Sequence, residues 1–184
     1  MGRRRGFLAL LASVVSLAVA VPIGAADLKD GLEAYCAKRL PEAFQILAPL
    51  AEKGDRDAQV IMGLRYFHGM DGKTDLRLAR KWYAKAAEQG DTWAQANLGN
   101  LYFSLGESGP SRVVGCKWLT ISSGGGDTEA QKLLEQKRSL ITADERSEAE
   151  RQAGQFEPHP TTGTLLVTRR CRPDSTQASK KTKD

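Results

Sequence analysis

The chain has 184 residues, of which 41% are hydrophobic, 27% are charged and 7% are aromatic. This length suits one domain of ordinary size and is too short for a (β/α)8 barrel, and the hydrophobic fraction argues against a chain that is disordered throughout. The net charge of +5 comes from the two ends, because residues 27–156 hold 18 basic and 19 acidic side chains. A nucleic-acid-binding protein would concentrate basic charge on its folded surface, so no nucleic acid partner is expected.

Residues 1–26 have the layout of a secretory signal peptide. Three arginines at positions 3–5 precede an uninterrupted apolar run from Phe7 to Val21, and small residues follow at Gly24–Ala26. This pattern predicts export and cleavage after Ala26, and hence a periplasmic or secreted protein. The arginines also fit the twin-arginine export route. An uncleaved membrane anchor is a further alternative, although the run is slightly short of the ~20 residues that span a bilayer. The mature chain has no second apolar run, so no membrane span is expected in it.

A six-residue pattern then recurs three times at a constant spacing of 36 residues. It occupies residues 54–59, 90–95 and 126–131, and every copy begins with Gly-Asp and ends with Ala-Gln. A fixed period of this length indicates an array of structural repeats. Other residues recur at the same spacing, namely Gly63 and Gly99, Tyr66 and Tyr102, Lys81 and Lys117, and Trp82 and Trp118.

Each period is typical of two helices. Asp55 can cap the first helix, and Ala58, Met62 and Tyr66 fall on one apolar stripe of it. A second helix is predicted from about Asp75 to Gln89, and the Gly at position 90 ends it. The flanks continue this scheme, which gives about eight helices in an all-α superhelix of antiparallel helix pairs. The other predicted helices cover residues 28–37, 41–52, 111–122 and 131–140, and a last helix opens with a capping box at 142–145 and runs to about 155.

The repeated residues resemble the Sel-1-like repeat family, a relative of the tetratricopeptide repeats. The pattern Gly-Asp-x-x-Ala-Gln followed by Gly and Tyr, then Trp-Tyr-x-Lys-Ala-Ala-Glu-x-Gly, spans residues 54–90, and a similar pattern spans 90–126. Residues 31–54 resemble the leader of secreted bacterial members. The resemblance divides the chain into a helical domain at 27–156, with repeats at 54–89 and 90–125, and a degenerate cap at 126–156. The third copy departs from the family pattern because Glu135 and Arg138 replace its Gly and Tyr.

Stacked helix pairs of this kind form a concave surface that binds peptides or protein segments. The face opposite the stripe of Ala58, Met62 and Tyr66 carries aromatic and amide side chains, which are suitable for binding a partner. Phe67 and Trp93 have an alternative role, which is packing against the neighbouring repeat. The candidate partner-binding residues are Leu64, Phe67, His68, Trp93, Asn97, Asn100, Ser104 and Gln136.

No catalytic motif stands beside this surface. Neither Ser-x-x-Lys nor Gly-x-Ser-x-Gly occurs, although some cysteine-rich relatives of the family have been linked to β-lactam binding or hydrolysis. The preferred hypothesis is therefore a non-enzymatic adaptor of the bacterial cell envelope, without a cofactor or a metal, that binds a protein or peptide in the periplasm. The alternatives are an envelope enzyme or cell-wall-binding protein, with β-lactam hydrolysis as the concrete case, and a structural or envelope-stress protein without a fixed partner.

The three cysteines and the C-terminal segment remain. Export favours disulfides, and an odd number of cysteines leaves at least one thiol unpaired in a monomer. We expect Cys171 to be linked to Cys36 or to Cys116. Residues 157–184 hold three prolines and a lysine-rich end, which predict a disordered basic tail, with one short strand possible at 164–168. Such a tail could contact anionic lipid or a cell-wall polymer, and the alternative is a solvated segment without a partner.

Overall fold

The computed structural model describes residues 27–105 and 109–159. The predicted signal peptide at 1–26, most of the predicted tail and Cys171 lie outside the described residues. Within them the chain forms eight α-helices and one short 3-10 helix, with no strand, which confirms the predicted all-α fold of about eight helices. No helix in this part of the chain is both long and apolar enough to span a bilayer.

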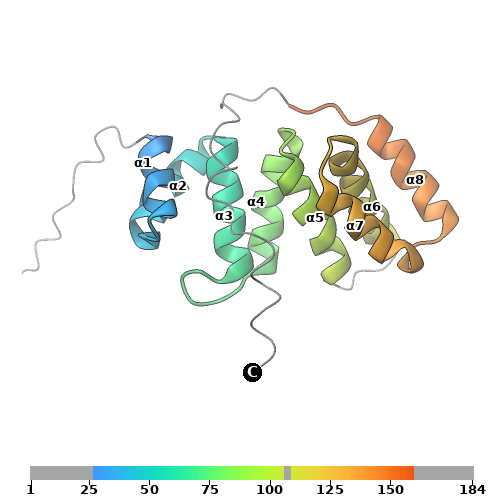
Figure 1. Ribbon diagram of the computed structural model, residues 1–184, viewed down its shortest axis with the longest axis horizontal. Coiled ribbons are helices and arrows are strands. Elements are labelled where there is room, and N and C mark those ends of the chain that lie inside the picture. The colour runs from blue at the N-terminus through green and yellow to red at the C-terminus, as the bar shows by residue number, and fades with distance from the viewer. Residues whose placement is uncertain (1–26, 106–108, 160–184) are drawn as a thin grey trace, which may run out of the picture.

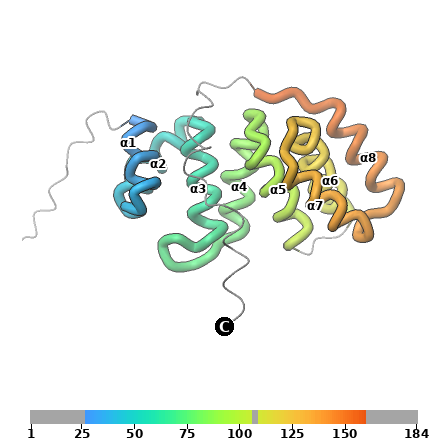
Figure 2. The backbone as a smooth tube through the Cα atoms, in the orientation of Figure 1, coloured from blue at the N-terminus to red at the C-terminus, as the bar shows by residue number. Residues whose placement is uncertain are grey.

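The helices follow one another as pairs (Figures 1 and 2). Each helix from α1 to α6 packs against the next one along the chain, so the array has two layers that alternate. The pairs are α1 (Leu28–Cys36) with α2 (Leu40–Glu52), α3 (Arg56–His68) with α4 (Leu76–Glu88), and α5 (Thr92–Ser104) with α6 (Gly109–Gly124); α7 (Thr128–Lys137), a 3-10 helix (Arg138–Leu140) and α8 (Ala143–Gly154) complete the array.

The repeated Gly-Asp pair starts the first helix of each unit. Asp55 accepts a hydrogen bond from the Ala58 amide at 2.8 Å, and Asp91 and Asp127 do the same for the amides of Ala94 and Ala130. The glycine before each aspartate has a positive φ, between 85° and 101°, which a residue with a side chain rarely adopts. The predicted caps are therefore confirmed, and this turn explains why each copy begins with Gly-Asp.

The Gln of the repeated Ala-Gln pair joins neighbouring units. Gln59 Nε2 donates a hydrogen bond to the Ala51 carbonyl at 3.1 Å, and Gln95 Nε2 donates to the Ala87 carbonyl at the same distance. In both cases the acceptor lies in the last turn of the preceding helix, where backbone carbonyls have no partner within the helix. Gln131 is exposed and makes no such bond among the described residues. The first two joints are thus built alike, and the third differs.

The predicted core residues pack between the two layers. Trp82 and Trp118 are 5% and 6% exposed, as expected for core positions. Tyr66 and Tyr102 are half-buried and pack against the same core from its edge.

The last helix does not pair with the helix that precedes it. In a regular unit α8 would pack on α7. Here α8 packs on α6 instead. The predicted capping box of α8 is present, since Thr142 and Glu145 each accept a hydrogen bond from the backbone of the other. Glu145 also accepts a hydrogen bond from Arg112 of α6 at 2.7 Å, which ties the two helices together.

Candidate functional site: the first-helix face

The predicted binding surface lies on the layer formed by the first helices of the units. We call it the first-helix face and define it by three sets of side chains at matching positions of the repeat. In α3 these are Asp57, Ile61 and Leu64, which are buried, and His68, with Phe67 beside it; in α5 they are Trp93, Asn97, Asn100 and Ser104; in α7 they are Glu129, Leu133 and Gln136.

The predicted residues differ in exposure. His68, Ser104 and Gln136 are exposed, and Phe67, Trp93, Asn97 and Asn100 are half-buried. Leu64 is only 1% exposed and belongs to the hydrophobic core, so the structure does not place it on an open surface.

Four aromatic rings meet where α3, α4 and α5 come together. The ring of His68 lies 4.9 Å from that of Phe67, Phe67 lies 6.3 Å from Tyr83, and Tyr83 lies 5.7 Å from Trp93, measured between centroids. The edge-on geometry of the first and last pairs is the favourable one for aromatic rings. We call these residues the aromatic row. Phe67 and Trp93 thus pack partly against the neighbouring helices, as the alternative interpretation required, and keep part of each ring on the surface.

Tyr83 was not among the predicted site residues. It is fully buried beneath Phe67 and Trp93, and it reaches this position by passing Gly63, which has no side chain in its way. The signal in the sequence that could have identified Tyr83 is the Trp-Tyr pair of the second helix. The matching position in the next repeat is Leu119, so the tyrosine is specific to this unit. The aromatic row therefore depends on a residue of the other layer.

The two titratable groups of the aromatic row are both shifted toward their neutral forms. Burial raises the pKa of Tyr83 well above 10, and the nearby Tyr35 and Asp91 raise it further. Burial also lowers the pKa of His68 below its usual 6.5. A neutral aromatic surface suits the apolar or aromatic side chains of a partner.

Amide groups line the part of the face that belongs to α5. Asn97 Nδ2 donates a hydrogen bond to the Trp93 carbonyl at 2.8 Å, which leaves its amide oxygen without a partner among the described residues. The Ser104 hydroxyl donates to the Asn100 carbonyl at 3.0 Å. Such groups can exchange hydrogen bonds with the backbone of a bound peptide.

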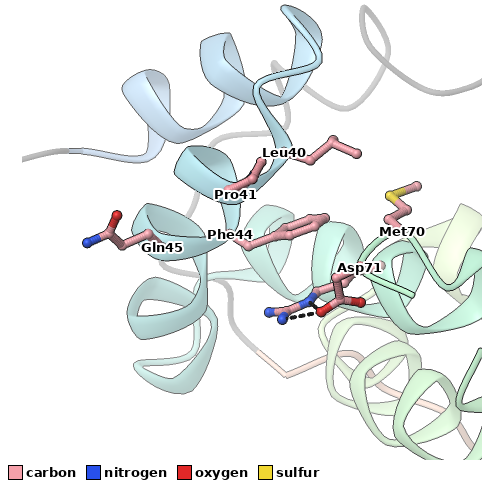
Figure 3. A pocket seen from close by; sticks show the side chains of 7 residues that line it. Leu40, Pro41, Phe44, Gln45, Met70 and Asp71 are labelled. Carbon is pink, nitrogen blue, oxygen red and sulfur yellow. Dashed lines mark hydrogen bonds and ion pairs between the residues drawn. The ribbon is translucent and has the colours of Figure 1, made fainter. Parts of the chain in front are cut away.

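A pocket lies at the edge of the array, between α2 and the turn that joins α3 to α4 (Figure 3). It has a volume of about 400 Å³ and a mainly apolar lining. Arg65 closes one side, where its guanidinium lies 4.7 Å from the centre of the Phe44 ring and its Nε donates to Asp71 at 2.8 Å. Figure 3 shows Phe44 and Met70 turned toward this space, whereas Gln45 points away from it. The sequence analysis did not identify this site.

Cys116 lies beside another cavity, of about 300 Å³, among α6, α7 and α8. It is a free thiol and 1% exposed, whereas Cys36 is disulfide-bonded. No group of three His, Cys, Asp or Glu side chains within residues 27–105 and 109–159 is arranged to hold a metal ion.

Comparisons with known proteins place this geometry in context. The family model described as the Sel1 repeat matches residues 56–91 and 94–126, which correspond to the α3–α4 and α5–α6 pairs. The search of curated proteins gave no match. Among solved structures, the chain is similar to a protective antigen of uropathogenic Escherichia coli strains that displays an SLR (Sel1-like repeat) fold, with a TM-score of 0.62 and 26% sequence identity. The alignment covers 71% of this chain and 30% of the antigen, so the chain spans less than a third of that relative.

Proposed function

Because the chain belongs to the Sel1-like repeat family, we propose that it is a non-enzymatic adaptor that binds a protein or peptide through the first-helix face. The helical repeat fold is suited to protein interactions, since stacked helix pairs present one extended surface built from successive units. We further propose that the adaptor works in the bacterial cell envelope. The support for this location is the export pattern of residues 1–26.

The aromatic row is the observation that carries the proposal. It combines rings that are anchored by packing with parts that remain accessible at Phe67, His68 and Trp93. Rings held in place lose little side-chain entropy on binding, and residues of this kind dominate the energetics of many interfaces. The neighbouring amides of Asn97 and Asn100 lie one turn apart on the same side of α5. A bound segment would meet an apolar region and a polar region at adjacent units.

Site-specific cross-linking tests the location of the binding surface. A photoreactive amino acid is placed in the living cell at Ser104, which is exposed on the first-helix face. The matched control carries it at Lys81, which is exposed on α4 in the other layer. We expect a discrete cross-linked product from position 104 and not from position 81. The same product from both positions, or from neither, would contradict the proposal.

Once a cross-linked partner is identified, affinity measurements test the aromatic row. We expect Trp93→Ala to weaken binding about tenfold or more, which corresponds to at least ~1.4 kcal/mol. The control Lys81→Ala should change the affinity by less than about twofold. Circular dichroism of both variants confirms that the helices are intact. Equal affinities for the two variants would place the binding surface elsewhere.

The envelope location has a separate test. Mass spectrometry of the protein from fractionated cells should find a mature chain that begins at Asp27 in the periplasmic or secreted fraction. A chain that retains residues 1–26 in the cytosolic fraction would contradict the location without affecting the binding surface.

A further inference from the structure

The pocket between α2 and the α3–α4 turn, which we call the edge pocket, contains an arginine that the repeat does not require. The position of Arg65 on α3 corresponds to Leu101 on α5 one period later, where the leucine is 1% exposed and belongs to the core. The position of Phe44 on α2 likewise corresponds to Arg80 on α4. A leucine at position 65 therefore suits the packing of a repeat unit. The arginine needs an explanation that is specific to this unit.

The walls of the edge pocket are held in place before any ligand binds. The guanidinium of Arg65 lies over two aromatic rings, 4.7 Å from the centre of the Phe44 ring and 5.3 Å from that of the Tyr66 ring. Backbone hydrogen bonds fix the adjoining turn, since the Met70 amide donates to the Arg65 carbonyl at 3.0 Å and the Asp75 amide donates to the Tyr66 carbonyl at 2.9 Å. A preformed pocket loses little conformational entropy when it is filled.

The size and lining of the edge pocket suit one large apolar side chain. Its volume of about 400 Å³ is well above the ~150 Å³ of a cavity that holds benzene. Leu40, Pro41, Phe44 and Met70 supply an apolar lining, and Figure 3 shows Phe44 and Met70 turned toward the space. An aliphatic or aromatic side chain placed there would be removed from water, which favours its binding.

The polar wall of the edge pocket offers one hydrogen-bond donor and one acceptor. Arg65 donates to Asp71 through Nε, at 2.8 Å, and through Nη2, and both hydrogen bonds end on Oδ2 of Asp71. Nη1 of Arg65 and Oδ1 of Asp71 have no hydrogen-bond partner in any other residue of the ranges 27–105 and 109–159. The two side chains are 23% and 40% exposed, so both remain accessible to a ligand. A peptide unit has one acceptor and one donor and matches this pair.

The charges of the pair cancel, and this decides the class of ligand. A single arginine beside an apolar pocket would favour a carboxylate ligand. Here the hydrogen bond from Arg65 lowers the pKa of Asp71, so the carboxyl group is ionised at neutral pH and neutralises the guanidinium. An anionic ligand would be repelled by Asp71, and a cationic ligand would be repelled by Arg65. A neutral peptide unit forms both hydrogen bonds without either repulsion.

We propose that the edge pocket binds one large apolar side chain, such as leucine or phenylalanine, from an uncharged stretch of a partner peptide, whose backbone hydrogen-bonds to Arg65 and Asp71. A carbonyl of the peptide accepts from Nη1 of Arg65, and an N–H of the peptide donates to Oδ1 of Asp71. The edge pocket and the first-helix face share no residue. The proposal therefore does not rest on the function assigned to that face.

Titration of the full, ¹⁵N-labelled chain with blocked tripeptides tests the proposal by NMR. The probe is N-acetyl-Gly-Leu-Gly-amide, and the matched probe N-acetyl-Gly-Ala-Gly-amide lacks the large side chain. We expect saturable shifts of the backbone amide signals of Met70 and Asp71 with the leucine probe. The alanine probe should bind at least about tenfold more weakly, because it leaves most of the pocket unfilled. A leucine probe in which an ester oxygen replaces the leucine N–H should also bind about tenfold more weakly.

A pair of matched variants tests the role of the arginine. Arg65→Leu introduces the residue that the next repeat has at this position, and we expect it to weaken binding of the leucine probe about tenfold. The control is Arg80→Leu, because the guanidinium of Arg80 lies 5.4 Å from the centre of the Tyr102 ring and Arg80 does not line the edge pocket. This control should change the affinity by less than about twofold. The probe series uses the unmodified chain and remains decisive if a variant fails to fold.

Several results would overturn the inference. These are the absence of saturable shifts with the leucine probe, equal affinities for the leucine and alanine probes, and equal affinities of Arg65→Leu and Arg80→Leu for the leucine probe. Tighter binding of N-acetyl-Gly-Leu with a free carboxylate would identify a site for acids. Shifts of the Met70 and Asp71 signals on concentrating the chain without a probe would assign the pocket to a second copy. None of these measurements involves the first-helix face, so their failure is distinct from a failure of the cross-linking test.

Discussion

Gly63 of α3 lies directly against the ring of Tyr83 of α4, so close that an added Cβ would be 2.4 Å from ring carbons Cδ1 and Cε1. The ring is fully buried and is held by Phe67 on one side and Trp93 on the other. It therefore has no room to move away. The recurrent helical glycine is explained by this close approach, which lets a second-layer tyrosine reach the first-helix face.

Gly63→Ala should destabilise the fold. Overpacking in a rigid core costs typically 1–3 kcal/mol, which exceeds the roughly 1 kcal/mol that alanine gains over glycine in helix propensity. We expect a net loss of up to about 2 kcal/mol in the free energy of unfolding, measured by urea denaturation. Gly124→Ala is the matched control, because a Cβ there would meet nothing within 4 Å. Equal urea midpoints for the two variants would show that the ring of Tyr83 can move to accommodate the added Cβ.

Tyr83→Phe should leave stability at neutral pH unchanged or slightly higher. The Tyr83 hydroxyl is buried without a hydrogen-bond partner among the described residues, so its removal relieves a desolvation cost of roughly 1–3 kcal/mol and leaves only a small void. A loss of several kcal/mol in urea denaturation would reveal a partner for the hydroxyl.

The same variant should alter the pH dependence of stability. The pKa of Tyr83 in the folded state lies well above 10, its value in the unfolded chain. The stability linked to this group is therefore fully present below pH 10 and is lost as the pH rises further, because the unfolded state then releases a proton that the folded state retains. We expect Tyr83→Phe to lose less stability than the unmodified chain between pH 9 and about pH 11. If the stability of the two proteins fell equally with pH over this range, the burial of the Tyr83 hydroxyl would be contradicted.

Cys116 should resist alkylation in the folded protein. It is 1% exposed, and burial raises the pKa of its thiol, so both access and the fraction of reactive thiolate are low. Mass spectrometry after treatment with iodoacetamide should show little modification of Cys116 in native buffer and complete modification in guanidinium chloride. Rapid labelling of the native protein would mean that the cavity among α6, α7 and α8 opens frequently.

The ion pair between Arg65 and Asp71 at the edge pocket should contribute little to the free energy of unfolding. It contributes only at pH values at which Asp71 is ionised. The hydrogen bond from Arg65 holds the pKa of Asp71 below its usual value, so the contribution is lost as the pH falls through the folded-state pKa of Asp71. Because the Asp71 side chain is 40% exposed, we expect a coupling energy of less than about 1 kcal/mol. A double-mutant cycle of Arg65→Met and Asp71→Asn at pH 7, repeated at successively lower pH until Asp71 is protonated, measures it. A coupling that persists at the lowest pH would contradict the electrostatic assignment.

The sequence was sufficient for the elements that local chemistry decides. The Gly-Asp turns predicted the caps at Asp55, Asp91 and Asp127, because each motif needs only its own neighbouring residues. The helix before the terminal capping box was less well predicted, since 131–140 proved to be an α-helix that starts at Thr128 and a separate 3-10 helix. The cap at Asp127 marks the start of this helix, whereas its C-terminal end has no cap motif and left little signal in the sequence.

Contacts between units were harder to predict. The burial of Leu64 and the position of Tyr83 depend on which helices approach one another, and a helical periodicity does not contain that information. The edge pocket is a similar case, because Phe44 comes from α2 whereas Arg65 and Met70 come from the next unit. The packing of α8 on α6 also has no counterpart in the repeat pattern.

The hydrogen bonds of Gln59 and Gln95 have a mechanical consequence. Each of these amides links one unit to its predecessor by a hydrogen bond. Gln131 makes no such hydrogen bond between α6 and α7 among the described residues. We therefore expect the array to be stiffer across its first two joints than at the third. Under an external load its curvature would change first at that joint, while the spacing of the aromatic rings would stay constant.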